Sequence, residues 1–352
     1  MYEKSFITDC EGPLTLNDNA FEIASCFIKY GNQLFKTLSL YDDYLVDVVK
    51  KPNYKAGNTL KLIIPFFLAE GLTNEDLVSF SKDNIFLVPG SRFLLSYVKN
   101  TMNTYIVSTS YGQYIEALSN YMDFPFENTY YTKADIDFPK ITSDETKKIQ
   151  EFKEIILKID LDNPNDIDIL DDIFWNKIPK MGFYDYIKDI EVVGGKGKEL
   201  AIENIIANHN INTSEILYIG DSITDVEPLK FARDNGGLSI SFNGNIYPLN
   251  VAEIAIISPN AIITAVIADI YVNFDKDLVL NFIQEYNLSN DLKTLFNEFN
   301  VNFEIQKEFF KAFPNQDYPI IKIISDENKE KILDLSSKMR KTIRGEDIGG
   351  LG

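Results

Sequence analysis

The sequence predicts an α/β fold with a parallel sheet, and two observations lead to that prediction. Short apolar stretches with strand character alternate with segments whose apolar residues recur at helical spacing, as in βαβ units. Several of these apolar stretches run directly into polar residues, such as Asp9 after Phe6-Ile7-Thr8 and Asp221 after Tyr218-Ile219-Gly220. Because the carboxyl ends of parallel strands meet at one edge of a sheet, these polar residues are expected to share a site.

Composition limits the possible functions. The 352 residues correspond to about two or three structural units. The chain has 34 basic and 53 acidic residues, a formal charge of −19, which disfavours nucleic acid and anionic membrane surfaces as partners. Two cysteines and one histidine exclude a disulfide framework and a Cys/His zinc site. There is no signal-peptide pattern at the start and no run of about 18 apolar residues, so we expect a cytoplasmic protein without membrane insertion.

The expected strands are short and largely apolar. They cover residues 5–8, 104–107, 126–131, 216–219, 238–242 and 253–257. Between the first two of them, apolar residues at helical spacing fill residues 15–84. The region beyond about Asp275 also reads as helical.

These patterns divide the chain into four parts. The α/β core is predicted to comprise residues 1–14, 85–134 and 191–274, interrupted by the helical module at 15–84. Residues 135–190 form an acidic insertion, which we interpret as a solvated addition without chemistry. Residues 275–352 are expected to be a helical C-terminal extension with a glycine-rich tail.

The polar clusters at the strand ends have the chemistry of a phosphoryl-transfer site. Asp9 and Asp221 offer the hard oxygen ligands that Mg²⁺ prefers, and a carboxylate can also attack phosphorus. Lys196 opens a helix and would screen negative charge, while the Ser108 hydroxyl would bond a phosphoryl oxygen. Main-chain N–H groups after the first strand, around Gly12, would add an anion nest.

Taken together and in order, these clusters resemble the four motifs of the haloacid dehalogenase (HAD) superfamily of phosphohydrolases. The matching segments are Phe6-Ile7-Thr8-Asp9-Cys10-Glu11-Gly12, Tyr105-Ile106-Val107-Ser108, Lys196-Gly197 and Gly220-Asp221-Ser222-Ile223-Thr224-Asp225. The resemblance implies a Rossmann-like HAD core, with the helical module at 15–84 as the cap that closes over the substrate. It does not cover the acidic insertion or the C-terminal extension.

The resemblance also implies roles for individual residues. Asp9 would be the nucleophile, Glu11 the acid/base, and Lys196 the group that bridges the phosphoryl group to Asp9. Phosphate binding would fall to Ser108, Thr109 and Gly12. Mg²⁺ would be held by Asp9, the main-chain carbonyl of Glu11, Asp221 and Asp225, the last directly or through water.

Two residues depart from the common pattern of the superfamily. Glu11 stands where most members have Asp, which changes the reach of the acid/base group. Pro13 stands where Thr or Val is common, and proline has no N–H to offer.

More narrowly, three segments resemble an archaeal branch of the superfamily assigned to energy-converting hydrogenase A as its subunit R. They are Asp9-Cys10-Glu11-Gly12-Pro13, Tyr54-Lys55-Ala56-Gly57-Asn58-Thr59-Leu60-Lys61-Leu62, and Met339-Arg340-Lys341 with Arg344-Gly345-Glu346. The resemblance implies a possible association with a hydrogenase complex. The basic ending either docks on a partner, folds back near the catalytic mouth, or is disordered.

Three functions follow as hypotheses. The first is a Mg²⁺-dependent phosphatase that hydrolyses a small phosphorylated metabolite through an aspartyl phosphate on Asp9. The second is a hydrogenase-associated accessory protein with little or no turnover, and the third is a phosphotransferase or mutase. The sequence does not identify the substrate or the oligomeric state.

Overall fold

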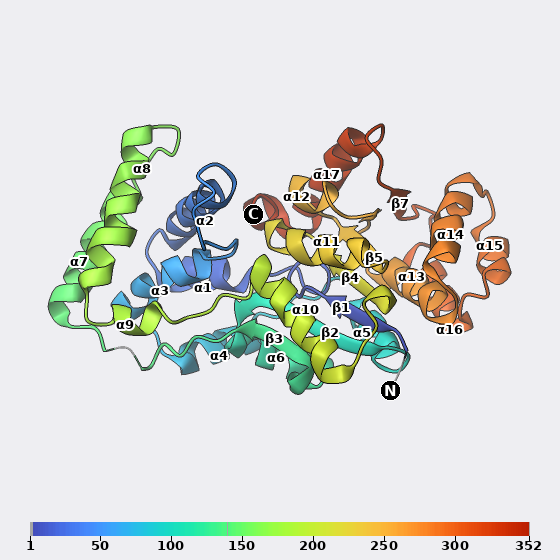
Figure 1. Ribbon diagram of the computed structural model, residues 1–352, viewed down its shortest axis with the longest axis horizontal. Coiled ribbons are helices and arrows are strands. Elements are labelled where there is room, and N and C mark those ends of the chain that lie inside the picture. The colour runs from blue at the N-terminus through green and yellow to red at the C-terminus, as the bar shows by residue number, and fades with distance from the viewer. Residues whose placement is uncertain (1–2, 139, 352) are drawn as a thin grey trace.

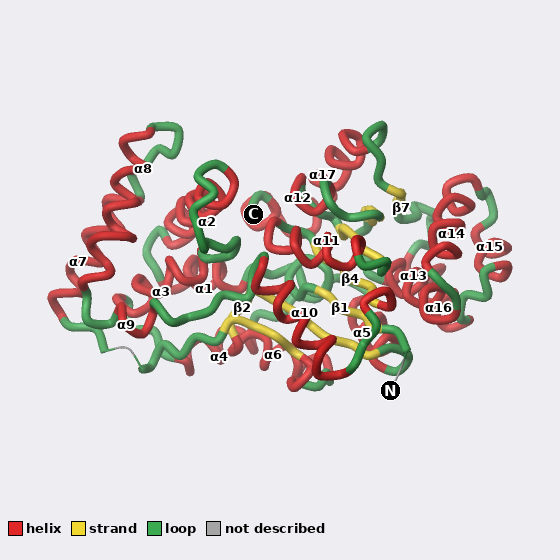
Figure 2. Tube along the Cα trace, in the orientation of Figure 1, coloured by secondary structure: helices red, strands yellow, loops and turns green. Residues whose placement is uncertain are grey.

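The computed structural model describes residues 3–138 and 140–351. The molecule is elongated, with its strands gathered in the middle and helices at both ends (Figures 1 and 2). The predicted α/β architecture with a mostly parallel sheet, a Rossmann-like core and a helical extension is confirmed. No helix in the described ranges is both long and apolar enough to cross a bilayer.

One sheet organises the described residues, in the order β3-β2-β1-β4-β5-β6-β7. Its strands are β1 (Ser5–Thr8), β2 (Asn103–Tyr111), β3 (Thr129–Thr132), β4 (Ile216–Gly220), β5 (Leu238–Phe242), β6 (Ile254–Ile257) and β7 (Ile320–Ile323). All neighbouring strands run parallel except β6 and β7. In β1, Thr8 lies opposite both Ile106 of β2 and Ile219 of β4. The residues that follow β1 and β4 and the end of β2 therefore emerge at one edge of the sheet.

Strand β7 corrects the expectation of an entirely helical C-terminal extension. Ile320–Ile323 pairs antiparallel with β6 along its whole length and forms an edge of the sheet. Only one of its four residues, Ile321, is fully buried. A four-residue segment that is half exposed carries too little alternation to predict a strand from sequence.

Helices cover both faces of the sheet, and successive side chains of β1 pack against the helices of opposite faces. Phe6 packs in the cluster formed with α5 (Ser91–Lys99), α6 (Gly112–Met122) and α13 (Ile262–Asn273). Ile7 points to the opposite face, where it packs with α10 (Lys196–His209) and α11 (Val226–Asp234). A strand buried on both faces needs apolar residues throughout, which explains the unbroken apolar stretches of the sequence.

A helical lobe lies beyond the parallel strands, at the left of Figure 1. We use this name for α1 (Asn19–Phe27), α2 (Gly31–Asp47), α3 (Thr59–Ala69) and α4 (Asn74–Asp83) together with α7 (Ser143–Ile156), α8 (Pro164–Asp171) and α9 (Tyr184–Ile187), the last two joined by a π-helical turn at Asp172–Lys177. Side chains from both stretches share one hydrophobic cluster, in which Leu38 and Phe67 meet Ile149 and Leu170. The acidic insertion therefore packs against the helical module that follows β1.

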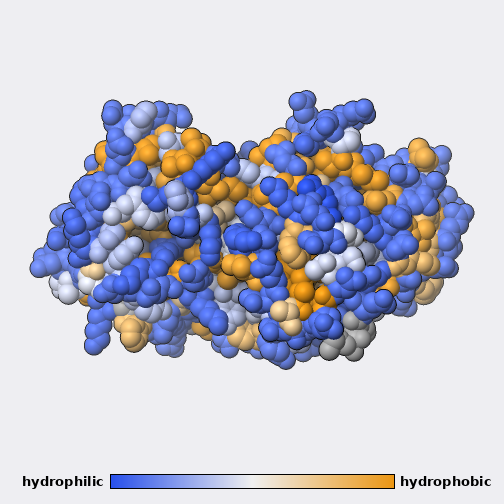
Figure 3. Space-filling view, viewed as in Figure 1, coloured by the Kyte–Doolittle hydropathy of each residue, from blue (hydrophilic) through white to orange (hydrophobic). Residues whose placement is uncertain are grey.

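The C-terminal extension first leaves the sheet and then returns to it. Helices α14 (Lys276–Leu288), α15 (Leu292–Glu298) and α16 (Phe303–Ala312) extend the core at the right of Figure 1. After β7, helix α17 (Lys329–Gly349) runs back past α12 (Ile246–Leu249) and ends between the core and the helical lobe. The space-filling view shows a saddle between these two parts on a largely hydrophilic face (Figure 3). Of the alternatives for the basic ending, the structure has it folded back.

Candidate active site

Asp9 lies at the centre of the candidate site because it follows β1, which is paired with β2 on one side and β4 on the other. Its N–H donates to the carbonyl of Ile219 in β4, 2.9 Å away, which continues the sheet pairing past the end of the strand. The side chain is 5% exposed, and its Oδ1 accepts from the N–H of Cys10 at 2.7 Å. Burial raises the pKa of Asp9 to about 8; Lys198 opposes this rise, and Asp225 and Asp221 add to it.

Lys198, and not Lys196, is the lysine that reaches Asp9. Its Nζ lies 2.6 Å from Oδ2 of Asp9 and 2.7 Å from Oδ1 of Asp225, and the side chain is fully buried. The predicted Lys196 is half exposed and pairs with Glu199 at 2.6 Å. Two residues along an α-helix rotate a side chain by about 200°, so the two lysines point to opposite sides of α10. The prediction for Lys196 is therefore wrong by two positions.

Asp225 is held by donors on every side. Its Oδ1 accepts from Lys198 and from the Tyr218 hydroxyl, both at 2.7 Å. Its Oδ2 accepts from the N–H groups of Asp221 at 2.9 Å and Ser222 at 3.1 Å, which caps the turn at Ile223–Asp225. Burial favours the neutral acid, but Lys198 and these hydrogen bonds leave the pKa of Asp225 below its ordinary value. Asp225 thus fixes the loop after β4 and orients Lys198.

Asp221 follows β4 and is paired with two arginines from the far end of the chain. Arg340 and Arg344, one turn apart on α17, both donate from Nη1 to its Oδ2, Arg344 at 3.1 Å. Neither arginine bonds Oδ1. Asp221 is 2% exposed, so its charge is balanced by these guanidinium groups rather than by solvent.

Gly12 has a steric role in place of the predicted phosphate-binding one. Its N–H donates to the carbonyl of Thr15 at 2.8 Å within the loop. Its φ is +102°, and a Cβ built there would lie 2.3–2.6 Å from the carboxylate atoms of Asp221. The loop after β1 can therefore lie against Asp221 only because residue 12 has no side chain.

Three hydroxyl groups from the end of β2 face the same region. Ser108 Oγ donates to Ser110 Oγ at 3.1 Å and accepts from the Ser110 N–H at the same distance. Thr109 has a buried Oγ1 without a hydrogen-bond partner in the described part of the chain. The predicted Ser108 and Thr109 are thus at the site, while Ser110 was not predicted.

Glu11 connects the loop after β1 with the helical lobe. Its Oε1 accepts from the N–H of Asn19, the first residue of α1, at 2.7 Å. An Asp at this position would be one methylene shorter, so the longer Glu side chain gives the carboxylate this reach. Burial, followed by the neighbouring Asp18, raises the pKa of Glu11 well above its ordinary value, and the Asn19 N–H and Arg344 oppose the rise.

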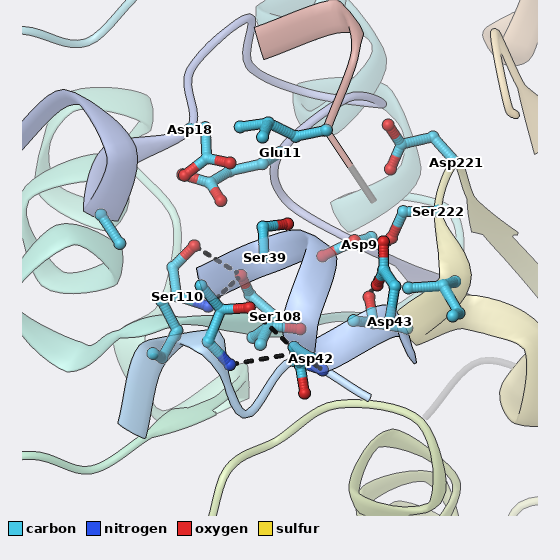
Figure 4. Close-up of a pocket in the computed structure, with 18 of the residues that line it drawn as sticks. Asp9, Glu11, Asp18, Ser39, Asp42, Asp43, Ser108, Ser110, Asp221 and Ser222 are labelled. Atoms are coloured by element: carbon cyan, nitrogen blue, oxygen red, sulfur yellow. Dashed lines mark hydrogen bonds between the residues drawn. The ribbon is translucent and has the colours of Figure 1, made fainter. Parts of the chain in front are cut away.

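A cavity of about 110 Å³ lies between the sheet edge, the helical lobe and α17. Figure 4 shows Glu11 and Asp18 side by side, across the cavity from Asp221 and Ser222, with Ser108 below them in this view. The core contributes Asp9, Glu11, Ser108, Thr109, Ser110, Asp221 and Ser222; the helical lobe contributes Ser39, Asp42, Asp43 and Thr59; and α17 contributes Arg340 and Arg344. Lys196, Gly12 and Asp225 are not among the lining residues.

The carboxylates fit a divalent cation. One oxygen each from Asp9, Asp221 and Asp225 lies within 4.8 Å of the others, and all three residues are buried. Asp225 already accepts five hydrogen bonds, which leaves Asp9 and Asp221 as the side chains suited to direct coordination. Buried oxygen ligands at such separations are the donor set that Mg²⁺ takes.

The chain is similar over its whole length to a protein of known structure. No family model matches the chain, and no curated protein matches it. Among solved structures, gene product AF1437 from Archaeoglobus fulgidus is similar over 99% of both chains, with 25% identity and a TM-score of 0.83. The whole architecture, including the helical lobe and the C-terminal extension, therefore occurs in another protein.

Weaker likenesses involve enzymes. A substrate-bound phosphoserine phosphatase has 15% identity and a TM-score of 0.46, and covers 74% of this chain and 95% of its own. HAD-family hydrolase t0658 from Salmonella enterica serovar Typhi has 12% identity and a TM-score of 0.41, and covers 70% of this chain and 64% of its own. Likenesses of this strength carry no argument about function, which rests on the site itself.

Proposed function

We propose that the protein is a HAD-type, Mg²⁺-dependent phosphatase that hydrolyses a small phosphorylated metabolite. One observation carries the proposal: Lys198 joins Asp9 and Asp225 in a buried site at the carboxyl edge of the sheet. A carboxylate aimed by a buried lysine, with hydroxyl groups and a second acid beside it, supplies a nucleophile and the positive charge that phosphoryl transfer needs. The cavity of about 110 Å³ fits a phosphoryl group and a small leaving group.

In the first step, an oxygen of Asp9 forms a bond to phosphorus and the bond from phosphorus to the leaving oxygen breaks. The leaving oxygen takes a proton from Glu11, whose pKa is raised well above its ordinary value, chiefly by burial. Ser108 and Thr109 hold phosphoryl oxygens, and Lys198 offsets the charge that accumulates near Asp9.

In the second step, Glu11, now ionised, takes a proton from water. The water oxygen bonds to phosphorus, and the bond from phosphorus to Asp9 breaks. This releases inorganic phosphate and restores both carboxyl groups to their starting forms. The bond from the Asn19 N–H keeps Glu11 in place between the two steps and couples it to the helical lobe.

Asp9, Asp221 and the main-chain carbonyl of Glu11 would hold Mg²⁺, with Asp225 behind them. When bound, the cation would neutralise charge on the carboxylates and the phosphoryl group. The chain's own residues determine the geometry, because Asp225 fixes the loop and the two arginines fix Asp221.

The proposal is tested with purified protein, Mg²⁺, an aryl phosphate and a panel of phosphorylated metabolites. We expect release of inorganic phosphate, its loss in Asp9→Asn, and a trapped aspartyl phosphate on Asp9 in the wild-type protein. Lys196→Ala is a matched control, because its side chain points away from the site.

If the folded protein with Mg²⁺ bound released no phosphate from any substrate of the panel, the result would instead favour an accessory protein of a hydrogenase complex. Transfer of the phosphoryl group to an added alcohol in place of water would favour a phosphotransferase or mutase.

A further inference from the structure

Arg340 combines a buried position at the cavity with an unused hydrogen-bond donor. The residue is 4% exposed and lines the cavity. Its Nε–H has no partner among the described residues, although its other nitrogens are engaged. A buried donor without an acceptor costs about 1–3 kcal/mol, so such a group in a native site calls for a ligand or an ordered water.

Arg344, the neighbouring arginine on α17, differs from Arg340 in this respect. Its Nε donates to the carbonyl of Leu16 at 3.1 Å, its Nη2 to the carbonyl of Asn17, and its Nη1 to Asp221 at 3.1 Å. All three nitrogens are therefore used within the protein. Arg344 fixes α17 to the loop after β1, whereas Arg340 retains a donor for something else.

Arg340 brings a positive charge and an unpartnered donor to the cavity wall, and an anionic oxygen would satisfy both. Lys198 is shared between Asp9 and Asp225 and is not a lining residue of the cavity. Arg340 thus supplies positive charge that faces the cavity with a donor to spare. Among the described residues, the Thr109 hydroxyl is a second unpartnered donor on the cavity wall, and both donors suit anionic oxygens. The third unpartnered atom on this wall, Oδ1 of Asp42, is an acceptor.

We propose that Arg340 is a phosphoryl-binding residue that the C-terminal helix adds to the active site. This inference rests on the proposed phosphatase function. Arg340 keeps its contact with Asp221 through Nη1 and donates from Nε to a phosphoryl oxygen. In this way the guanidinium group joins the phosphoryl group to the carboxylate opposite it.

The helix that carries Arg340 is anchored well enough for this role. The Ser336 hydroxyl donates to the carbonyl of Gly244 at 2.7 Å, one turn before Arg340. Ile332 packs in a cluster with Leu249 and Ile257 of the core. One turn after Arg340, Arg344 bonds the carbonyl of Leu16 in the loop after β1. The guanidinium group is therefore held from both sides along the helix.

The test measures binding of inorganic phosphate by calorimetry at saturating Mg²⁺, which does not depend on turnover. The variants are Arg340→Gln and Arg340→Lys, with Lys338→Gln as the control. Lys338 is on the same helix, but its side chain is exposed and pairs with Asp334. Mg²⁺ affinity and melting temperature are measured for each protein, so that a shift of Asp221 is detected separately.

We expect Arg340→Gln to weaken phosphate binding about ten- to hundredfold, since the lost hydrogen bond joins two charged groups. The phosphate affinity of Arg340→Lys should lie between those of Arg340→Gln and the wild type. If Arg340→Gln does not fold, the comparison of Arg340→Lys with the wild type is the test. Lys338→Gln should bind phosphate like the wild type.

Unchanged phosphate affinity in both folded Arg340 variants would overturn the inference, even if Mg²⁺ affinity changed. Phosphate binding that survives in these variants while Asp9→Asn abolishes hydrolysis would leave the phosphatase function standing without Arg340. Absence of phosphate binding in the wild-type protein would overturn the inference, whereas release of inorganic phosphate in the hydrolysis assay would leave the phosphatase function standing.

Discussion

The Nζ of Lys198 lies 2.6 Å from Oδ2 of Asp9, and the lysine side chain is fully buried while Asp9 is 5% exposed. The lysine also holds Asp225, so it joins the segments that follow two neighbouring strands. Removing it would leave two buried carboxylates without a cation. The loss of this ion pair determines the expected effect of replacing Lys198 on the free energy of unfolding.

Lys198→Ala should lower the free energy of unfolding by about 3–5 kcal/mol and abolish hydrolysis, because breaking a buried ion pair leaves an unpaired charge. Lys196→Ala, two residues away and half exposed, should change it by less than about 0.5 kcal/mol. Chemical denaturation and initial rates measure both effects. Equal effects of the two substitutions would contradict this account of α10.

Mg²⁺ should raise the melting temperature more at pH 8 than at pH 6. The pKa of Asp9 is raised to about 8, chiefly by burial, so below that pH a bound cation must displace its proton. Without metal, the stability of the fold has the opposite pH dependence. The raised pKa of Asp9 stabilises the native state fully below about pH 4, and this contribution is lost as the pH rises to about 8.

Thermal melts with and without Mg²⁺ across this pH range measure both trends. Asp9→Asn should remove the pH dependence of the Mg²⁺ effect. A Mg²⁺ effect that is equally large at pH 6 and pH 8 would show that Asp9 is ionised throughout.

Gly12→Ala should abolish activity and lower stability, because the added Cβ would lie 2.3–2.6 Å from the Asp221 carboxylate. Gly71→Ala is the matched control, since Gly71 also has a positive φ, +76°, but a Cβ added there would have no atom within 4 Å. Backbone strain alone should cost each variant about 1–3 kcal/mol. Activity should be lost only in the first, and equal activities would refute the steric role of Gly12.

Glu11→Gln should slow hydrolysis of alkyl phosphates much more than hydrolysis of aryl phosphates. A good leaving group departs without a proton, whereas an alkoxide needs one from Glu11, and general acid catalysis typically contributes about 10²–10⁴-fold. Steady-state rates with the two substrate classes measure the difference. The same loss for both classes would assign Glu11 to structure, through its bond with Asn19.

Arg344→Ala should lower the free energy of unfolding by about 2–4 kcal/mol, because it leaves the carbonyls of Leu16 and Asn17 without a donor and removes one of the two arginines that bond Asp221. Lys341→Ala, on the same helix with a half-exposed side chain, should be nearly neutral. Denaturation curves of the two variants give the comparison. A neutral Arg344→Ala would mean that α17 is not fixed to the loop after β1.

The sequence was sufficient to predict the parts of the site that follow strands. Asp9 and Asp221 each come directly after an apolar stretch, and the parallel sheet brings them to one edge. The lysine was placed two positions away because Gly195-Lys196-Gly197-Lys198 offers two candidates, and only the rotation of α10 distinguishes them. Gly12 was assigned a donor role because sequence does not show that its N–H is used by Thr15.

Other features required contacts that no local pattern contains. Arg340 and Arg344 are spaced as neighbours on one helix face, and their basic segment was noted, but nothing near them in sequence identifies Asp221 as their partner. The packing of the acidic insertion against the helical module likewise depends on apolar residues from separate segments. Strand β7 was missed because the pairing with β6, and not its own four residues, determines its conformation.

The bonds from Arg344 to the loop after β1 join residues 328 positions apart in the chain. Contacts between residues so far apart in sequence form late in folding, because the chain loses the entropy of closing a long loop before the contact stabilises it. The cavity should therefore be complete only after the sheet, the helical lobe and the C-terminal extension have all assembled. Recovery of phosphate binding during refolding would then lag behind the recovery of helical signal, and the interval would time the docking of α17.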